Sequence, residues 1–131
     1  MAPELKYLLF SVILCFGQVV VLALGAMGQV GLPTLAGNRE SLPDLGGWAG
    51  RARRAHLNMI ENLVLFAALV LVAVVSQKTS PVTALGAAVF FWARLVYAVV
   101  YIVGVPWLRT LVWGVSVVGM AMIAFPLLSA L

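Results

Sequence analysis

The stretch 51–73 reads RARRAHLNMIENLVLFAALVLVA, and it decides the fold. Residues 51–62 include guanidinium, imidazole, amide and carboxylate groups, whereas residues 63–73 are apolar without a break. This pattern predicts a membrane helix with a polar beginning. Ionisable groups at membrane depth are costly, so they normally face a bundle interior or a water-filled cavity and mark a functional site. We therefore expect the functional site at the start of this helix.

The composition indicates an integral membrane protein. Of 131 residues, 64% are apolar and 9% are charged, and the mean hydropathy is +1.13. Soluble domains carry about 25% charged residues, so this chain has too few to cover a surface that faces water. The net charge of +4 does not indicate nucleic-acid binding, because the basic residues flank apolar runs, as topology signals do.

Four apolar runs predict an all-α, four-helix membrane bundle that forms one domain over residues 1–131. The runs cover roughly residues 7–29, 54–76, 82–103 and 107–130, each close to the ~20 residues that cross a bilayer. The first run is too long for the apolar part of a signal peptide, so we expect it to be retained. The long connection, residues 30–50, is rich in glycine and proline and is predicted to be a loop.

Lysine and arginine positions predict the orientation of this multi-pass protein. Four arginines lie in or beside the first connection, one lies within the third run, and one follows the third connection. The two lysines, Lys6 and Lys78, lie on the opposite side. Because basic residues favour the cytoplasmic face, both of these connections are expected there. Both chain termini are then expected outside, and the site is expected to face the cytoplasm.

Cys15 and His56 are the only cysteine and the only histidine. Cys15 lies within the first apolar run, where a single thiol most often serves as a small apolar filler. His56 points away from the Arg54 stripe and is expected to be structural or interfacial. With no further thiol or imidazole, a metal site is not expected.

Polar side chains form two stripes on the predicted second and third spans. At about 100° per residue, positions separated by three, four or seven residues share one helix face. The candidate site residues are those of the two stripes, together with the basic residue that follows the third connection: Arg54, Asn58, Glu61, Arg94, Tyr97, Tyr101 and Arg109. Asn62 lies beside the first stripe.

Two interpretations of these stripes are open. In one, Glu61 and Arg94 form a structural ion pair, and the other arginines and tyrosines anchor helix ends at the interface. In the other, one carboxylate cannot neutralise Arg54, Arg94 and Arg109, so surplus positive charge remains in a cavity. Such a site suits a small anion with a cationic end, because guanidiniums bind carboxylates in forked geometry. A surplus guanidinium also stabilises a thiolate nucleophile.

The spacing of these residues resembles a known family. The stretch 54–62, RAHLNMIEN, resembles the R-A-x-x-N-x-x-E signature of the MAPEG family, the membrane-associated proteins in eicosanoid and glutathione metabolism. The stretch 94–101, RLVYAVVY, resembles the R-x-x-Y-x-x-x-Y of a later helix in that family. Arg109 lies near its downstream arginine. The resemblance covers essentially the whole chain and is closest to small bacterial members.

This resemblance implies a homotrimer in a bacterial inner membrane that binds glutathione, as a co-substrate, between neighbouring subunits. By motif position, six residues would contact glutathione: Arg54, Asn58, Glu61, Arg94, Tyr97 and Tyr101. Arg109, with Tyr97, would stabilise the thiolate. The second substrate would be a lipophilic small molecule arriving from the bilayer, and no metal is implied.

Three functions are therefore compared. The first is a membrane-bound glutathione-dependent transferase or peroxidase acting on lipophilic electrophiles or hydroperoxides. The second is a non-catalytic protein of the same fold that binds a lipid headgroup or another anion in the intersubunit cavity. The third, a transporter or channel, is disfavoured because the sequence shows neither a pair of broken half-helices nor an internal repeat.

Overall fold

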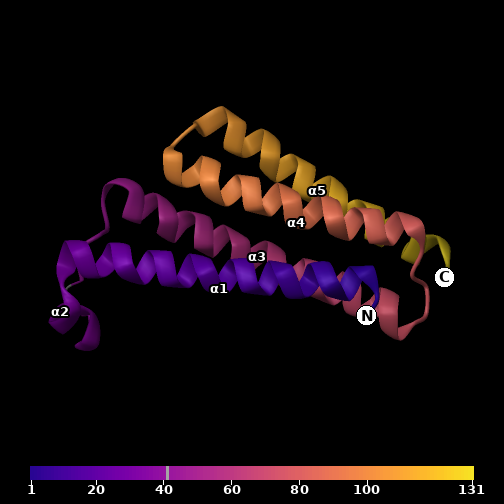
Figure 1. The fold of residues 1–131 in the computed structure, drawn as a ribbon, viewed down its shortest axis with the longest axis horizontal. Coiled ribbons are helices and arrows are strands. Elements are labelled where there is room, and N and C mark those ends of the chain that lie inside the picture. The colour runs from indigo at the N-terminus through magenta and orange to yellow at the C-terminus, as the bar shows by residue number, and fades with distance from the viewer. Residues whose placement is uncertain (41) are drawn as a thin grey trace.

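The computed structural model describes residues 1–40 and 42–131, and the described chain is helical apart from short connections (Figure 1). Its helices are α1 Pro3–Val30, α2 Leu32–Ala36, α3 Gly47–Val75, α4 Pro81–Val103 and α5 Pro106–Ser129. Four of them, α1, α3, α4 and α5, are long and apolar enough to cross a membrane. The predicted all-α fold with four spans is confirmed.

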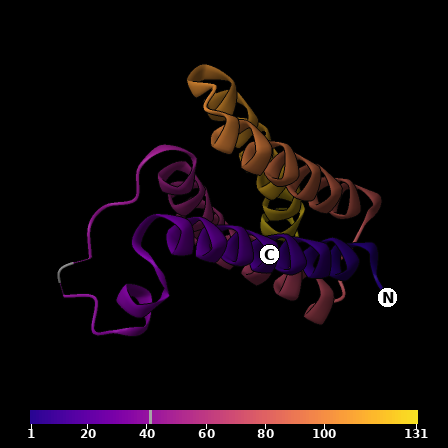
Figure 2. The same cartoon turned by 60° about the vertical axis from the view of Figure 1, so that its left-hand side comes forward.

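The long helices form two antiparallel pairs, α1 with α3 and α4 with α5 (Figures 1 and 2). Helix α4 joins the pairs, since it contacts α1, α3 and α5. Both chain termini lie at the end of the bundle where α3 ends and α4 begins (Figure 1). The opposite end holds the start of α3, the end of α4 and the start of α5, and these are the segments that carry the predicted site.

Local signals fix the limits of α4. The Ser80 side chain accepts a hydrogen bond from the Thr83 backbone N–H at 3.2 Å, and the Ser80 N–H donates to Thr83 Oγ1 at 2.7 Å. This reciprocal pair satisfies N–H groups that a helix start leaves free. At the other end, Gly104 adopts a φ of +94°, a left-handed conformation that glycine accepts without strain. The turn it makes leads directly into α5.

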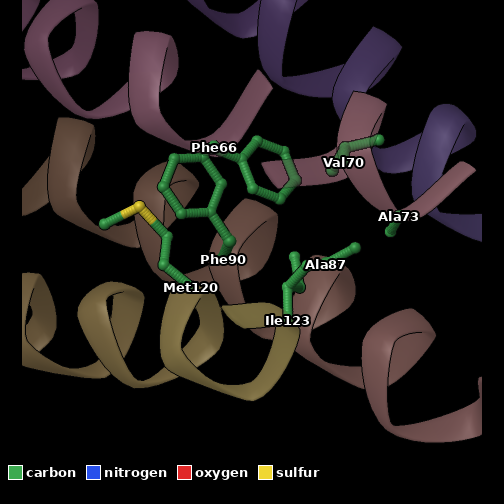
Figure 3. Close-up of a cluster of buried hydrophobic side chains, with 7 residues drawn as sticks. All are labelled: Phe66, Val70, Ala73, Ala87, Phe90, Met120 and Ile123. Atoms are coloured by element: carbon green, nitrogen blue, oxygen red, sulfur yellow. The ribbon is translucent and has the colours of Figure 1, made fainter. Parts of the chain in front are cut away.

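An apolar core lies between α3, α4 and α5, near the end that holds the chain termini. Figure 3 shows its seven buried side chains: Phe66, Val70, Ala73, Ala87, Phe90, Met120 and Ile123. The rings of Phe66 and Phe90 stack with centroids 3.9 Å apart. Many apolar side chains on the outer surfaces of the same helices are exposed, as expected where lipid surrounds a bundle.

Close backbone contact holds α4 against α5. A Cβ atom added to Gly86 would lie 2.6 Å from the Gly119 carbonyl oxygen, and one added to Gly119 would lie 2.7 Å from the Gly86 oxygen. Small residues at such crossings let membrane helices approach closely and gain van der Waals contact. The α4–α5 pair therefore depends on these two glycines.

The long connection is shorter than the sequence indicates, and part of it is helical. Helix α2 lies within it, and α3 begins at Gly47 rather than near Arg54. The Gln29 side chain binds the Gly46 backbone twice, donating to its oxygen at 2.7 Å and accepting from its N–H at 2.9 Å. This pair fixes the start of α3 to the end of α1, so α3 extends through glycines that favour a loop on their own.

Candidate functional site

The candidate site centres on Tyr101 in α4, which lies between two arginines from other helices. Arg54 of α3 donates from Nε to the Tyr101 hydroxyl oxygen at 3.2 Å. The Arg109 guanidinium of α5 lies 4.6 Å from the Tyr101 ring centroid. A cation at this distance from an aromatic face is attracted by the ring. The ring thus holds two positive groups together near one end of the bundle.

Tyr97 extends this arrangement one turn further into the membrane. Its ring centroid lies 5.5 Å from that of Tyr101, with the rings edge to face. The Arg94 guanidinium lies 4.2 Å from the Tyr97 ring centroid. Both tyrosines are buried and pack against Ala55 of α3, whose small side chain leaves room for the two rings. Three guanidiniums therefore lie against two phenol rings that pack edge to face.

A polar cavity opens beside these rings between α3, α4 and α5. It has a volume of about 180 Å³ and is lined by Asn58, Tyr97, Arg109, Thr110 and Trp113. Pockets for drug-sized ligands usually have volumes of about 300–1,000 Å³. One chain therefore supplies only part of a site for a ligand as large as a tripeptide.

Asn58 is held in place by a second amide. Asn62 Nδ2 donates to the Asn58 side-chain oxygen at 3.2 Å and to the Asn58 backbone oxygen at 2.8 Å. Asn62 is buried and Asn58 is partly exposed to the cavity. Because Asn62 occupies the side-chain oxygen of Asn58 as a donor, the Asn58 NH₂ group remains for an acceptor on a ligand.

Glu61 and Arg94 do not form the structural ion pair that one interpretation of the sequence required. Glu61 is exposed on the outer face of α3, whereas Arg94 is only 1% exposed. The three guanidinium nitrogens of Arg94 have no hydrogen-bond partner among the described residues. Arg94 also does not line the polar cavity and instead lies behind the Tyr97 ring.

The structure thus gathers six of the seven predicted residues and separates one. Arg54, Tyr97, Tyr101 and Arg109 are in contact, Asn58 lines the same cavity as Tyr97 and Arg109, and Arg94 packs on the Tyr97 ring. Glu61 lies apart, exposed on the surface of the single chain.

Sequence reasoning missed two lining residues, Thr110 and Trp113. Helical spacing indicates Trp113, because it lies four residues after Arg109 and so shares its face. Arg51 has a different role from the interfacial one considered for it. Its Nε donates to the Ile102 carbonyl oxygen at 2.9 Å, which satisfies a carbonyl group left free at the end of α4.

Comparison with known proteins gives one match. A family model described as the MAPEG family matches residues 6–129. Neither the curated proteins nor the solved structures include a significant match to this chain. The matched range includes α3, α4 and α5 whole, α1 except for its first three residues, and every candidate site residue. The chain belongs to the MAPEG family.

Proposed function

We propose that the protein is a glutathione-dependent transferase or peroxidase that acts on lipophilic electrophiles or hydroperoxides within the membrane. The observation that carries this proposal is the surplus of positive charge at Tyr101. Arg54 and Arg109 meet on this residue, and the nearest acidic residue along the three helices, Glu61, lies on the exposed face of α3. An anion bound there would accept charge-assisted hydrogen bonds from these two guanidiniums, which Glu61 does not neutralise.

Glutathione matches the groups present at the site. Its two carboxylates suit the Arg54 guanidinium and the donors of Asn58 and Tyr101, and its ammonium suits Glu61. Arg109 lines the cavity beside Tyr97, so its guanidinium and the Tyr97 hydroxyl would stabilise the thiolate. Arg94 would contribute as the positive charge behind the Tyr97 ring.

The thiolate would then react in either of two ways. With an electrophilic carbon, the sulfur forms a carbon–sulfur bond and a leaving group departs with the bonding pair. With a hydroperoxide, the sulfur attacks the outer oxygen, the oxygen–oxygen bond breaks, and the alkoxide takes a proton to become an alcohol. The thiol of a second glutathione attacks the sulfur of the resulting sulfenic acid, which forms the disulfide and releases the hydroxyl group as water. The exposed apolar helix faces suit a lipophilic substrate that diffuses through the bilayer.

We also propose that the site is completed by a neighbouring subunit in a homotrimer. The polar cavity of about 180 Å³ is small for a tripeptide. Glu61 is exposed on a membrane helix, where an unpartnered carboxylate is costly. A second subunit against this face of α3 would enclose both the ligand and Glu61.

The proposal is tested by calorimetry of glutathione binding to the purified protein in detergent. The test compares replacement of Arg54 with replacement of its neighbour Arg53. Arg54 and Arg53 are both exposed, but only Arg54 is bonded to Tyr101. We expect Arg54→Ala to weaken binding by about tenfold or more, because a charge-assisted hydrogen bond contributes about 1.5–3 kcal/mol. Arg53→Ala removes the same charge and should leave affinity nearly unchanged.

Equal losses in both variants would show a diffuse charge effect and contradict the site assignment. If the folded wild-type oligomer binds no glutathione, the transferase proposal is wrong. Native mass spectrometry would then test the alternative of a non-catalytic protein, which predicts a retained anionic lipid.

A further inference from the structure

A second polar cluster lies between α1, α3 and α4, away from the cavity at Arg109. Cys15 of α1 and His56 of α3 approach each other, with Sγ 3.9 Å from Nδ1. Cys15 is half-buried and His56 is buried. When the imidazole carries its proton on Nε2, Nδ1 is free to accept the thiol proton. The thiol therefore has a base beside it inside the membrane.

Arg94 supplies the positive charge of this cluster. It is 1% exposed, and its three guanidinium nitrogens have no hydrogen-bond partner among residues 1–40 and 42–131. Its positive charge interacts with the Cys15 sulfur. A buried guanidinium with no anion is costly. A negative charge that forms next to it, whether on sulfur or on the oxygen of a bound ligand, would be stabilised by N–H groups that have no other partner.

An apolar cavity lies between the same three helices, and its lining includes Leu14 and Leu95, the chain neighbours of Cys15 and Arg94. It has a volume of about 250 Å³, lies between α1, α3 and α4, and includes Gln18, one turn after Cys15. Exposed Val21 and Val99 lie at its wall, so it opens on the surface that faces lipid. The Gln18 side-chain oxygen is buried and has no hydrogen-bond partner within the part of the chain that the structure describes. The cavity thus offers apolar walls for an alkyl chain and one free polar atom.

We propose that Cys15 is a nucleophilic thiol that adds to lipophilic α,β-unsaturated carbonyl compounds that enter this cavity from the bilayer. The thiol proton moves to His56 Nδ1, and the sulfur forms a bond to the β-carbon. The π electrons of the double bond shift to give an enolate, whose oxygen is stabilised by Arg94. The proton returns from His56 to the α-carbon, which leaves a saturated thioether and no other product.

This reaction differs from the transferase chemistry proposed above, because the sulfur belongs to the protein. It needs no glutathione, and each chain reacts once. Burial in an apolar environment disfavours a thiolate. The reactivity of Cys15 therefore depends on His56 and Arg94 rather than on exposure alone.

The test follows the mass of the full-length protein in nanodiscs during exposure to trans-2-nonenal without glutathione. We expect one added aldehyde per chain, located at Cys15 by peptide mapping and absent in Cys15→Ser. His56→Gln should slow the addition by about a hundredfold, the lower end of the usual contribution of general acid–base catalysis. Size-exclusion profiles of both variants establish that they remain folded.

A matched control tests whether the reactivity of Cys15 comes from His56 and Arg94 or only from the depth of the thiol in the membrane. Phe16 is the next residue along α1 and is 68% exposed. Phe16→Cys in the Cys15→Ser background places a thiol at nearly the same depth without His56 or Arg94 beside it. We expect this thiol to react at least tenfold more slowly than Cys15. An unmodified wild-type Cys15, or equal rates for the two thiols, would overturn the proposal.

Discussion

The two ends of the bundle are built from the same helices but meet their packing needs in different ways. Near the chain termini, α3, α4 and α5 enclose stacked phenyl rings and aliphatic side chains (Figure 3). At the other end, the same helices hold Tyr97 and Tyr101 against arginines. The apolar core is complete within one chain, although Glu4 at the same end keeps one buried carboxylate oxygen without a hydrogen-bond partner among the described residues. The polar end leaves three guanidinium nitrogens of Arg94 without such a partner in the described chain, and it leaves Glu61 exposed.

This difference is the reason we propose that binding takes place at the polar end. In lipid, apolar contact gains little from exclusion of water, so the apolar end is stabilised by close packing and van der Waals contact. Buried polar groups without partners lower stability. The polar end retains such groups, and under the proposal an anion or a second subunit would supply the missing partners and offset their cost.

The largest expected effect is a loss of stability caused by a substitution in the close-packed apolar end. Gly119→Ala places a Cβ atom 2.7 Å from the Gly86 oxygen and 2.8 Å from the Phe90 nitrogen, and neither backbone atom can move without shifting α4. We expect a loss of about 3 kcal/mol in the free energy of unfolding, the upper end of the usual cost of overpacking. Denaturant titration in detergent micelles measures it.

Gly114→Ala on the same helix is the matched control, since a Cβ atom there meets nothing within 4 Å. It should leave the free energy of unfolding unchanged or slightly higher, because alanine has the better helix propensity. Equal losses in the two variants would show that α4 and α5 do not pack through Gly86 and Gly119.

Much of this fold was predictable from the sequence, because long apolar runs leave few alternatives in a membrane. The candidate site was predictable in part. Helical periodicity put Arg94, Tyr97 and Tyr101 on one stripe, and all three are indeed buried. Periodicity gives the face of one helix but not which neighbouring helix lies against it.

That limit explains the failure of the Glu61–Arg94 pair. The pair requires the two polar stripes to face each other, but α3 turns Glu61 outward while Arg94 is buried against the Tyr97 ring. The early start of α3 was missed for a related reason. Glycines at 46, 47 and 50 indicate a loop, whereas the paired hydrogen bonds from Gln29 to Gly46 depend on contact with α1.

At the polar end we expect a smaller change in stability, and in the opposite direction. Arg94→Met replaces the unpartnered guanidinium with an apolar chain of similar length. We expect the free energy of unfolding without ligand to rise by about 1 kcal/mol, because apolar replacements of buried charges are often stabilising. The same variant should bind glutathione less tightly by calorimetry. A loss of several kcal/mol in stability would instead mean that Arg94 has a structural partner in the assembled protein.

The smallest expected effect separates the two interactions of Tyr101. Tyr101→Phe removes the oxygen that accepts from Arg54 at 3.2 Å but keeps the ring beneath the Arg109 guanidinium. One hydrogen bond contributes about 1 kcal/mol, so we expect glutathione affinity to fall by about fivefold. Tyr7→Phe, in α1 near the apolar end, is the control and should leave affinity unchanged. If Tyr101→Phe binds as tightly as the wild type, the ring alone positions both arginines, and the hydroxyl has no part in the site.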